Sequence, residues 1–385
     1  MPTLDADSRE LASSASGIGR LVMERVGTGD PRLLRADDLY EGRWGAAAFL
    51  AQLQQMNASA DKRSVLERLR RDDDDSGTGH SPGGAFSGTG ARVFGRLLVW
   101  AASGDRRLLA EASALMRALE HRVNIRADIV SGAAGLIRVA LRLHTLTGDP
   151  RLLEQTVAWG DELIAMAIPL ETGLGWTTVS SAPSTGFAHG AAGIGSTLLH
   201  LYHRVNHDRF RRAGFDALQF ERSLIRADQT NRQQTNDGST PNAPTICAWC
   251  YGAAGIGMSR WTLPRDCWGP EEQRDACLAL AALHTTTYTN DCLCHGEFGR
   301  IELLLNAGVR FKRRSLIGEA RRRALTMVRT REGDPQQWRV RVGREQRFSY
   351  GLMTGLSGIG YQLLRCVRPG AVPSILSVHP SILCG

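Results

Sequence analysis

The stretch FAHGAAGIGSTLLHLY, residues 187–202, decides how the chain folds. Two glycines three residues apart, Gly190 and Gly193, open an apolar pattern with helical spacing. The same Gly-x-x-Gly tetrad returns before other apolar helical segments, at Gly42–Gly45, Gly132–Gly135, Gly252–Gly255, Gly296–Gly299 and Gly355–Gly358. We align a seventh, degenerate copy from Gly88, with Ala91 at the second glycine position. Repetition on this scale predicts a series of similar helical units.

The tetrads account for a glycine content that is otherwise unusual. Glycine makes up 42 of 385 residues, where the average share is about 7%. Each glycine inside a helix costs about 0.5–1 kcal/mol relative to alanine, so repeated use indicates that another backbone or a ligand approaches closely. Between the tetrads, Gly104-Asp105 and Gly148-Asp149 are typical of tight turns, with glycine ending one helix and aspartate capping the next.

These repeats predict an all-α fold, an α/α toroid of seven inner and seven outer helices. The last repeat keeps its full tetrad, whereas an open solenoid usually ends in a polar capping repeat; a closed ring is therefore favoured. We expect the tetrads to gather at one end of the inner ring. The expected domains are an N-terminal helical extension over 1–37 and the toroid over 38–385.

Composition and charge exclude several classes of protein. No apolar stretch approaches the ~18 residues needed to span a bilayer, and no secretory signal is visible at the start of the chain. We therefore expect a cytoplasmic protein without a membrane span. Residues 310–347 hold twelve Arg and one Lys against four acids. We interpret this segment as a solvated helix face and a polar hairpin. A site for nucleic acid or for an acidic peptide is the alternative, but no nucleic-acid-binding motif accompanies it.

Thiols and histidines gather directly before the tetrads. Cys247-Ala-Trp-Cys250 precedes one tetrad and Cys292-Leu-Cys294-His295 precedes the next, so the two groups meet if the tetrads converge. Soft thiolates and an imidazole select zinc. Spacing alone does not choose among these five ligands. Four ligands would make a closed structural site, and three with an open position a catalytic one. An iron–sulfur cluster fits less well, because only one pair has two-residue spacing.

With these motifs the chain resembles the LanC-like lanthionine cyclase family. The resemblance lies in WCYGAAGIG, CHGEFGRIELLL, FAHGAAGIG, DIVSGAAGL and GLMTGLSGIGYQLLR, and it covers roughly residues 38–378. The closing segment is most similar to the C-terminal cyclase domain of type 2 lanthipeptide synthetases. The resemblance implies an α/α toroid with a central zinc. It further implies that Cys250, Cys294 and His295 hold the metal, that His189 is the acid/base residue and that Asp128 lies near the metal.

The chain also departs from the family pattern. Ile246 stands where some stand-alone cyclases have an arginine, and Tyr251 replaces the histidine common in type 2 enzymes. Cys247 and Cys292 are left as bystanders. The dehydratase half of type 2 synthetases is absent from this sequence. We expect a separate dehydratase as a partner; the alternatives are that the sequence is a fragment of a larger synthetase or a decaying copy.

The expected function is zinc-dependent formation of thioether rings in a precursor peptide. A cysteine of the dehydrated precursor peptide would lose its proton at the metal and add to dehydroalanine or dehydrobutyrine. His189 is the candidate acid for the resulting enolate; Asp128 would orient His189, help to deprotonate the thiol, or simply cap a helix.

Three alternatives stay open on the sequence. One is a glutathione- or thiol-binding relative, and another is a non-catalytic peptide-binding scaffold with structural zinc. The third, glycoside hydrolysis, needs two carboxylates about 5–10 Å apart; Glu297 and Asp128 are the only candidate pair, and the thiols would be unexplained.

Overall fold

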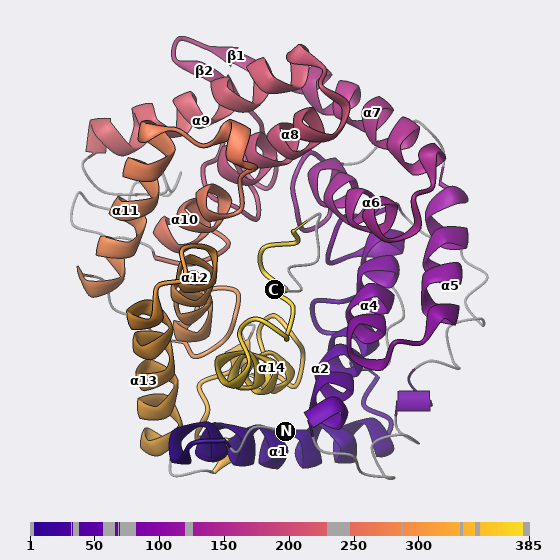
Figure 1. Ribbon diagram of the computed structural model, residues 1–385, viewed down its shortest axis with the longest axis vertical. Helices are drawn as coiled ribbons and strands as arrows, with labels where there is room; N and C mark the ends of the chain where they lie inside the picture. Colours follow the sequence, from indigo (N-terminus) through magenta and orange to yellow (C-terminus); the bar gives the residue numbers. More distant parts are fainter. Residues whose placement is uncertain are drawn as a thin grey trace.

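The computed structural model shows a closed ring of helices in two layers (Figure 1). It describes residues 4–31, 33, 38–56, 66–67, 69, 82–119, 126–228, 247–285, 288, 290–331, 334–342 and 347–379. The inner layer consists of α2 (Arg43–Met56), α4 (Gly88–Ser103), α6 (Ala133–Thr147), α8 (Ala191–Val205), α10 (Ala253–Trp261), α12 (Glu297–Arg310) and α14 (Leu356–Val367). Each inner helix packs against the next, and α14 packs against α2. The predicted toroid is therefore confirmed.

The outer layer covers the inner helices one by one. It consists of α1 (Ala6–Gly27), α5 (Arg106–Arg117), α7 (Pro150–Ala165), α9 (Asp208–Asp228), α11 (Pro270–Thr285) and α13 (Arg314–Thr330). The stretch between α2 and α4, where a seventh outer helix is expected, lies largely outside the described residues. The predicted turns are present: Gly104 and Gly148 have a φ of 69°, and Asp105 and Asp149 cap the helices that follow.

The tetrads form the N-termini of the inner helices. The first glycine is the N-cap residue, as at Gly132, and the second lies in the first turn against the carbonyl oxygen six residues earlier. A Cβ on Gly135 would collide with Ile129 O, and one on Gly193 with Phe187 O. The glycines are thus required because the preceding loop folds back onto the helix and its carbonyls accept from N–H groups of the first turn.

The alignment of the second repeat was wrong by one residue. Gly90 lies against Gly84 O, as the second glycine does in the other repeats, and Ser87 is the N-cap residue of α4. The tetrad here is Ser87-Gly88-Thr89-Gly90. The lost glycine is therefore the first one, at the N-cap, where serine is well tolerated; Ala91 is an ordinary helix residue.

Helix α1 also belongs to the outer layer. It packs against α14, α13 and α2, next to the point where the first and last inner helices meet. One face of α1 is apolar and buried, with Leu11, Ile18 and Val22 in the core. The segment expected as an N-terminal extension thus supplies the outer helix that covers α14.

The last described segment of the chain lies inside the ring (Figure 1). After α14, residues 369–379 turn back into the bore, where Val372, Ile375 and Leu376 are buried. Trp249 Nε1 donates to Leu376 O at 2.9 Å, and Arg138 donates to Ser377 O at 3.0 Å. This segment, called the tail below, therefore fills the bore from the end opposite the tetrads.

The remaining elements are small. β1 (Ile168–Leu170) pairs antiparallel with β2 (Gly173–Gly175), and β3 (Arg341–Val342) pairs with β4 (Arg347–Phe348). Short 3₁₀ turns occupy η1 (Arg265–Cys267) and η2 (Pro335–Gln337). Among the helices of the described part of the chain, none is both long and apolar enough to cross a bilayer.

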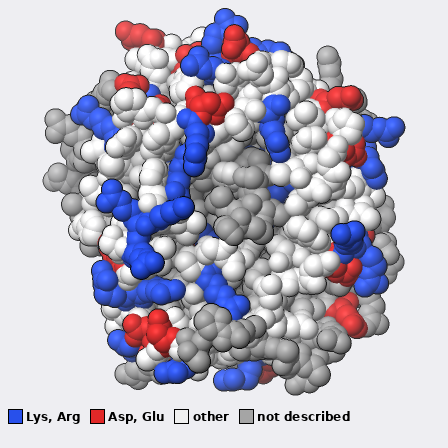
Figure 2. Space-filling view, viewed as in Figure 1, with Lys and Arg blue, Asp and Glu red and all other residues white. Residues whose placement is uncertain are grey.

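The basic segment lies on one side of the ring. In Figure 2, Lys and Arg gather where α12 and α13 lie. Two members of the arginine triplet in α13 make internal contacts: Arg321 donates to Cys366 O at 2.8 Å, and Arg323 binds Glu319 and Glu297. Part of the positive charge thus ties α13 to its neighbours, and the expectation that the segment binds no nucleic acid stays a prediction.

Candidate metal centre and proton-transfer site

Seven loops, one before each inner helix, meet at one end of the ring. We number them loop 1 (38–42), loop 2 (82–87), loop 3 (126–132), loop 4 (184–190), loop 5 (247–252), loop 6 (290–296) and loop 7 (349–355). Backbone hydrogen bonds join neighbouring loops; Cys294 N donates to Met353 O, and Cys250 N donates to Cys294 O. Because all seven inner helices begin here, the positive ends of their dipoles converge on this point, which favours thiolates.

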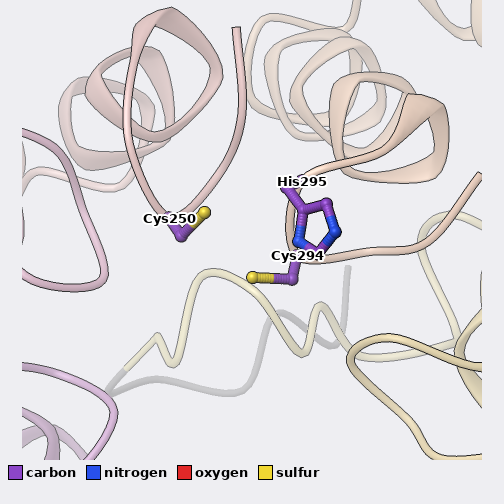
Figure 3. A group of neighbouring side chains, drawn as sticks. All are labelled: Cys250, Cys294 and His295. Atoms are coloured by element: carbon purple, nitrogen blue, oxygen red, sulfur yellow. The ribbon is translucent and has the colours of Figure 1, made fainter. Parts of the chain in front are cut away.

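Loops 5 and 6 bring Cys250, Cys294 and His295 together. Their ligand atoms all lie within 4.8 Å of one another. Figure 3 shows both sulfur atoms directed into the space between the two loops, with the imidazole beside them. Cys250 and Cys294 are 9% and 4% exposed, while His295 is exposed. Two buried thiols and an accessible imidazole make a donor set suited to zinc, with access from one side.

The two thiols interact directly. Their hydrogen bond lowers the pKa of Cys250 and raises the pKa of Cys294 well above its usual value. Burial lowers the pKa of His295, which keeps its imidazole neutral, the form that binds metals. A cation at this place would replace the proton that the two sulfur atoms share.

An aromatic floor lies under the cluster. Trp249, fully buried beside Cys250, makes an edge contact with Phe86 at 5.4 Å and a tilted contact with Phe187 at 5.9 Å between ring centroids. Its indole N–H binds the tail. The floor therefore separates the cluster from the bore, so that the cluster is accessible from the side of the loops.

Loops 3 and 4 bring Asp128 and His189 together. His189 Nδ1 lies 2.7 Å from Asp128 Oδ2, while Asp128 Oδ1 accepts from Ser131 N at 2.8 Å. The carboxylate is fully buried and the histidine side chain is 19% exposed. A carboxylate at Nδ1 requires the proton there and leaves Nε2 as the nitrogen free to exchange protons.

Tyr251 connects this pair with the cluster. Its ring stacks at a tilt on His189, with 5.4 Å between centroids. Burial, and then the charges of Cys250 and Asp128, raise its pKa to about 12. Because Tyr251 directly follows Cys250 in loop 5 and its ring contacts His189 of loop 4, the pair and the cluster lie on neighbouring loops.

The other cysteines of the two clusters are not among the grouped ligands. Burial raises the pKa of Cys292 to about 12, so that it stays a thiol, and Cys247 is buried and belongs to no group of neighbouring ligand atoms in the described residues. Ile246 lies outside the described residues. Glu297 binds Arg300 and Arg323 in the helix layers, while Asp128 binds His189, so the two carboxylates considered for glycoside hydrolysis have different partners.

Tyr40 is the residue that sequence reasoning missed. Its Oη lies 2.7 Å from Cys294 Sγ. Tyr40, Cys250 and Cys294 each stand five residues before the second glycine of their tetrads. That shared position was visible in the sequence and could have indicated that the three side chains point to the same place.

Fold and site together define a helical toroid with a candidate metal centre at its middle. The lanthionine synthetase C-like protein family matches residues 35–377, so the chain belongs to this family. Nisin cyclase has the same fold, with a TM-score of 0.65, 18% identity and coverage of 94% of this chain and 97% of that one.

A curated relative from Lactococcus lactis subsp. lactis extends the comparison to sequence. The lacticin 481/lactococcin biosynthesis protein LcnDR2 is 25% identical over 195 residues, which is 47% of this chain and 20% of that protein. The match thus spans about a fifth of the length of this relative.

Proposed function

We propose that the chain forms thioether rings in a dehydrated precursor peptide, by adding cysteine thiols to dehydroalanine or dehydrobutyrine, and that it uses zinc. The observation that carries this proposal is the convergence of Cys250, Cys294 and His295 with the His189–Asp128 pair at one end of the toroid. Family membership and the names of the relatives, which concern lanthipeptide biosynthesis, support the same reaction.

The donor set fits zinc. Two thiolates and an imidazole are ligands that zinc prefers, and three protein ligands leave a fourth position for a substrate. Cys250, Cys294 and His295 would hold the ion, which when bound supplies a positive charge that makes a substrate thiol acidic near neutral pH. Cys247 and Cys292 would stay outside this set.

The chain's own residues would handle the proton. In the addition, the thiol loses its proton, a carbon–sulfur bond forms at the β-carbon, and the electron pair of the double bond becomes an enolate. That enolate takes a proton at the α-carbon, so no group leaves and no oxidant is needed. His189 would deliver the proton from Nε2, since Asp128 holds Nδ1.

The arrangement of the site fits a peptide as substrate. The floor at Trp249 closes the inner side, while His189 and His295 are accessible from the loops. A dehydrated peptide would reach the site there, and a separate dehydratase would supply it. We further propose that the chain works in the cytoplasm.

A synthetic peptide with one dehydroalanine and one cysteine a few residues away tests the proposal. Incubation with the zinc-loaded chain should abolish alkylation of the peptide thiol at unchanged peptide mass, as thioether formation requires. Peptide alone and chain with chelator are the controls. An unchanged thiol count in the presence of bound zinc would rule out the cyclase.

The same assay distinguishes the alternatives. Addition of glutathione to the dehydroalanine, with the peptide thiol left free, would favour the thiol-adding relative. A folded chain that binds the peptide without changing it would favour the scaffold.

A further inference from the structure

Tyr40 contributes a phenol to the candidate metal centre from the far end of the sequence. Its Oη donates to Cys294 Sγ at 2.7 Å, across a separation of 254 residues. The ring brings the two together because loop 1 lies beside loop 7, and loop 7 beside loop 6. At equivalent positions of three repeats, two side chains are thus thiols and the third is a hydroxyl donor.

The backbone around Tyr40 is held in place independently of the hydroxyl. Tyr40 O accepts from Leu352 N at 3.0 Å and from Met353 N at 2.9 Å, and Met353 O accepts from Cys294 N at 2.9 Å. These bonds connect loop 1 to loop 7 and loop 7 to loop 6. The hydroxyl and the sulfur are therefore held at the two ends of one hydrogen-bonded path.

Side chains hold the same loop from two sides. The Tyr40 ring makes an edge contact with Phe86, with 6.3 Å between centroids and planes at 84°. The neighbouring residue, Glu41, accepts hydrogen bonds from Ser349 and Thr354 of loop 7. Loss of the hydroxyl alone would thus leave the ring in place.

We propose that Tyr40 is a positioning residue of the metal centre, which orients the Cys294 sulfur and withdraws electron density from it. The inference rests on the proposed zinc site. A hydrogen bond to a thiolate stabilises charge on the sulfur, so the sulfur transfers less charge to its metal. Partners of this kind tune both the orientation of a ligand and the acidity of the metal. Tyr40 would thereby favour ionisation of the substrate thiol without touching the substrate.

The test uses the full chain loaded with Co²⁺, whose absorption includes a sulfur-to-cobalt charge-transfer band. Tyr40→Phe removes one oxygen atom and keeps the ring. We expect the band to move to lower energy, because the sulfur electrons are then less stabilised, and the metal dissociation constant to rise about 10-fold. Tyr350→Phe in loop 7 is the matched control; Tyr350 contacts Phe348 and Arg25, and its variant should keep both values.

A second variant tests the direction of the effect. Site-specific incorporation of 3-fluorotyrosine at position 40 strengthens the donor, so the band should move to higher energy. A band and a dissociation constant equal to those of the unaltered chain, in Tyr40→Phe with an intact fold, would overturn the inference and leave the zinc site standing. If the unaltered chain binds neither cobalt nor zinc, the metal centre itself is overturned, and the role of Tyr40 with it.

Discussion

His189 and Asp128 form a pair across two loops of the ring, with Nδ1 of the imidazole 2.7 Å from Oδ2 of the carboxylate. The other carboxylate oxygen accepts from Ser131 N. The backbone of loop 3 thus holds the Asp128 carboxylate in place independently of the histidine. The alternative that Asp128 simply caps a helix is wrong, because Gly132 is the N-cap residue of α6; its contact with Nδ1 supports the proposal that it orients His189.

Asp128→Asn should slow ring formation strongly and leave metal binding intact. The amide keeps the shape and can still accept from Ser131 N, but its NH₂ group can face Nδ1 and impose the other tautomer. Loss of an aligned acid/base residue costs about 10²–10⁴ in rate. The checks are the rate with the dehydroalanine peptide and the zinc content by mass spectrometry.

Asp38→Asn is the control for this prediction. Asp38 stands in loop 1 at the position that Asp128 has in loop 3, and its carboxylate likewise accepts from the N–H three residues on, that of Glu41, at 3.0 Å. The substitution therefore tests the turn alone, since the His189 contact belongs to Asp128. Equal rate losses in both variants would mean that Asp128 acts only through the loop.

One zinc ion should bind to each chain, and its binding should depend on the grouped ligands alone. Cys294→Ala removes a sulfur from the cluster and should abolish zinc binding at micromolar metal, whereas Cys292→Ala, whose sulfur stays protonated, should retain it. Zinc content and circular dichroism check this together. A folded, zinc-free and inactive Cys294→Ala chain supports a catalytic ion, while an unfolded chain would point to a structural one.

The second tetrad glycines should tolerate no side chain. In Gly135→Ala the new Cβ would collide with Ile129 O and with Ala85 N, and backbone cannot yield as a flexible side chain does. We expect a loss of about 1–3 kcal/mol in the free energy of unfolding, typical of overpacking. Gly318→Ala is the control: its nearest neighbour is Arg322 Nη1 at 3.5 Å, so this helical site should gain about 0.4–1 kcal/mol. Similar changes in both variants, measured by denaturant titration, would contradict the close approach.

Local pattern predicted the inner helices, their glycines and the caps at Asp105 and Asp149, because each depends on residues a few positions apart. It could not predict that α1 covers α14, because an apolar helix face does not indicate which helix, more than 300 residues away, it packs against. The burial of the tail could not be predicted for the same reason. The hydroxyl of Tyr40 was missed because a phenol is not among the usual zinc ligands, although Tyr40 has the same position before its tetrad as Cys250 and Cys294.

The stability of the fold should fall as the pH drops from 7 to 5, in part through His200. Burial, and then the charge of Arg138, hold the pKa of His200 well below its usual value; His379 lies against its ring at 5.1 Å. The imidazole is neutral in the fold but takes a proton in the unfolded chain below about pH 6.5. The unfolded state therefore binds more protons, and stability is lost as the pH falls.

His200→Phe should reduce this slope by up to about 1.4 kcal/mol per pH unit. Denaturant titrations at pH 5, 6 and 7 measure it. His207→Gln, at an exposed position, should keep the original slope. A slope unchanged in His200→Phe would show that the buried imidazole does not control the acid response.

Tail packing should make a large contribution to stability. Leu376 is 1% exposed, and its carbonyl accepts from Trp249, the floor of the metal centre. Leu376→Ala keeps that backbone hydrogen bond but opens a cavity in the bore, at a cost of about 2–5 kcal/mol. Leu278→Ala in α11, where the side chain is 54% exposed, should change stability by less than about 0.5 kcal/mol.

Because the cavity lies behind the floor and not among the ligands, the remaining folded Leu376→Ala protein should still bind zinc. Chemical denaturation and zinc titration check both parts; a loss of zinc affinity without a loss of stability would place the tail in the site rather than beneath it.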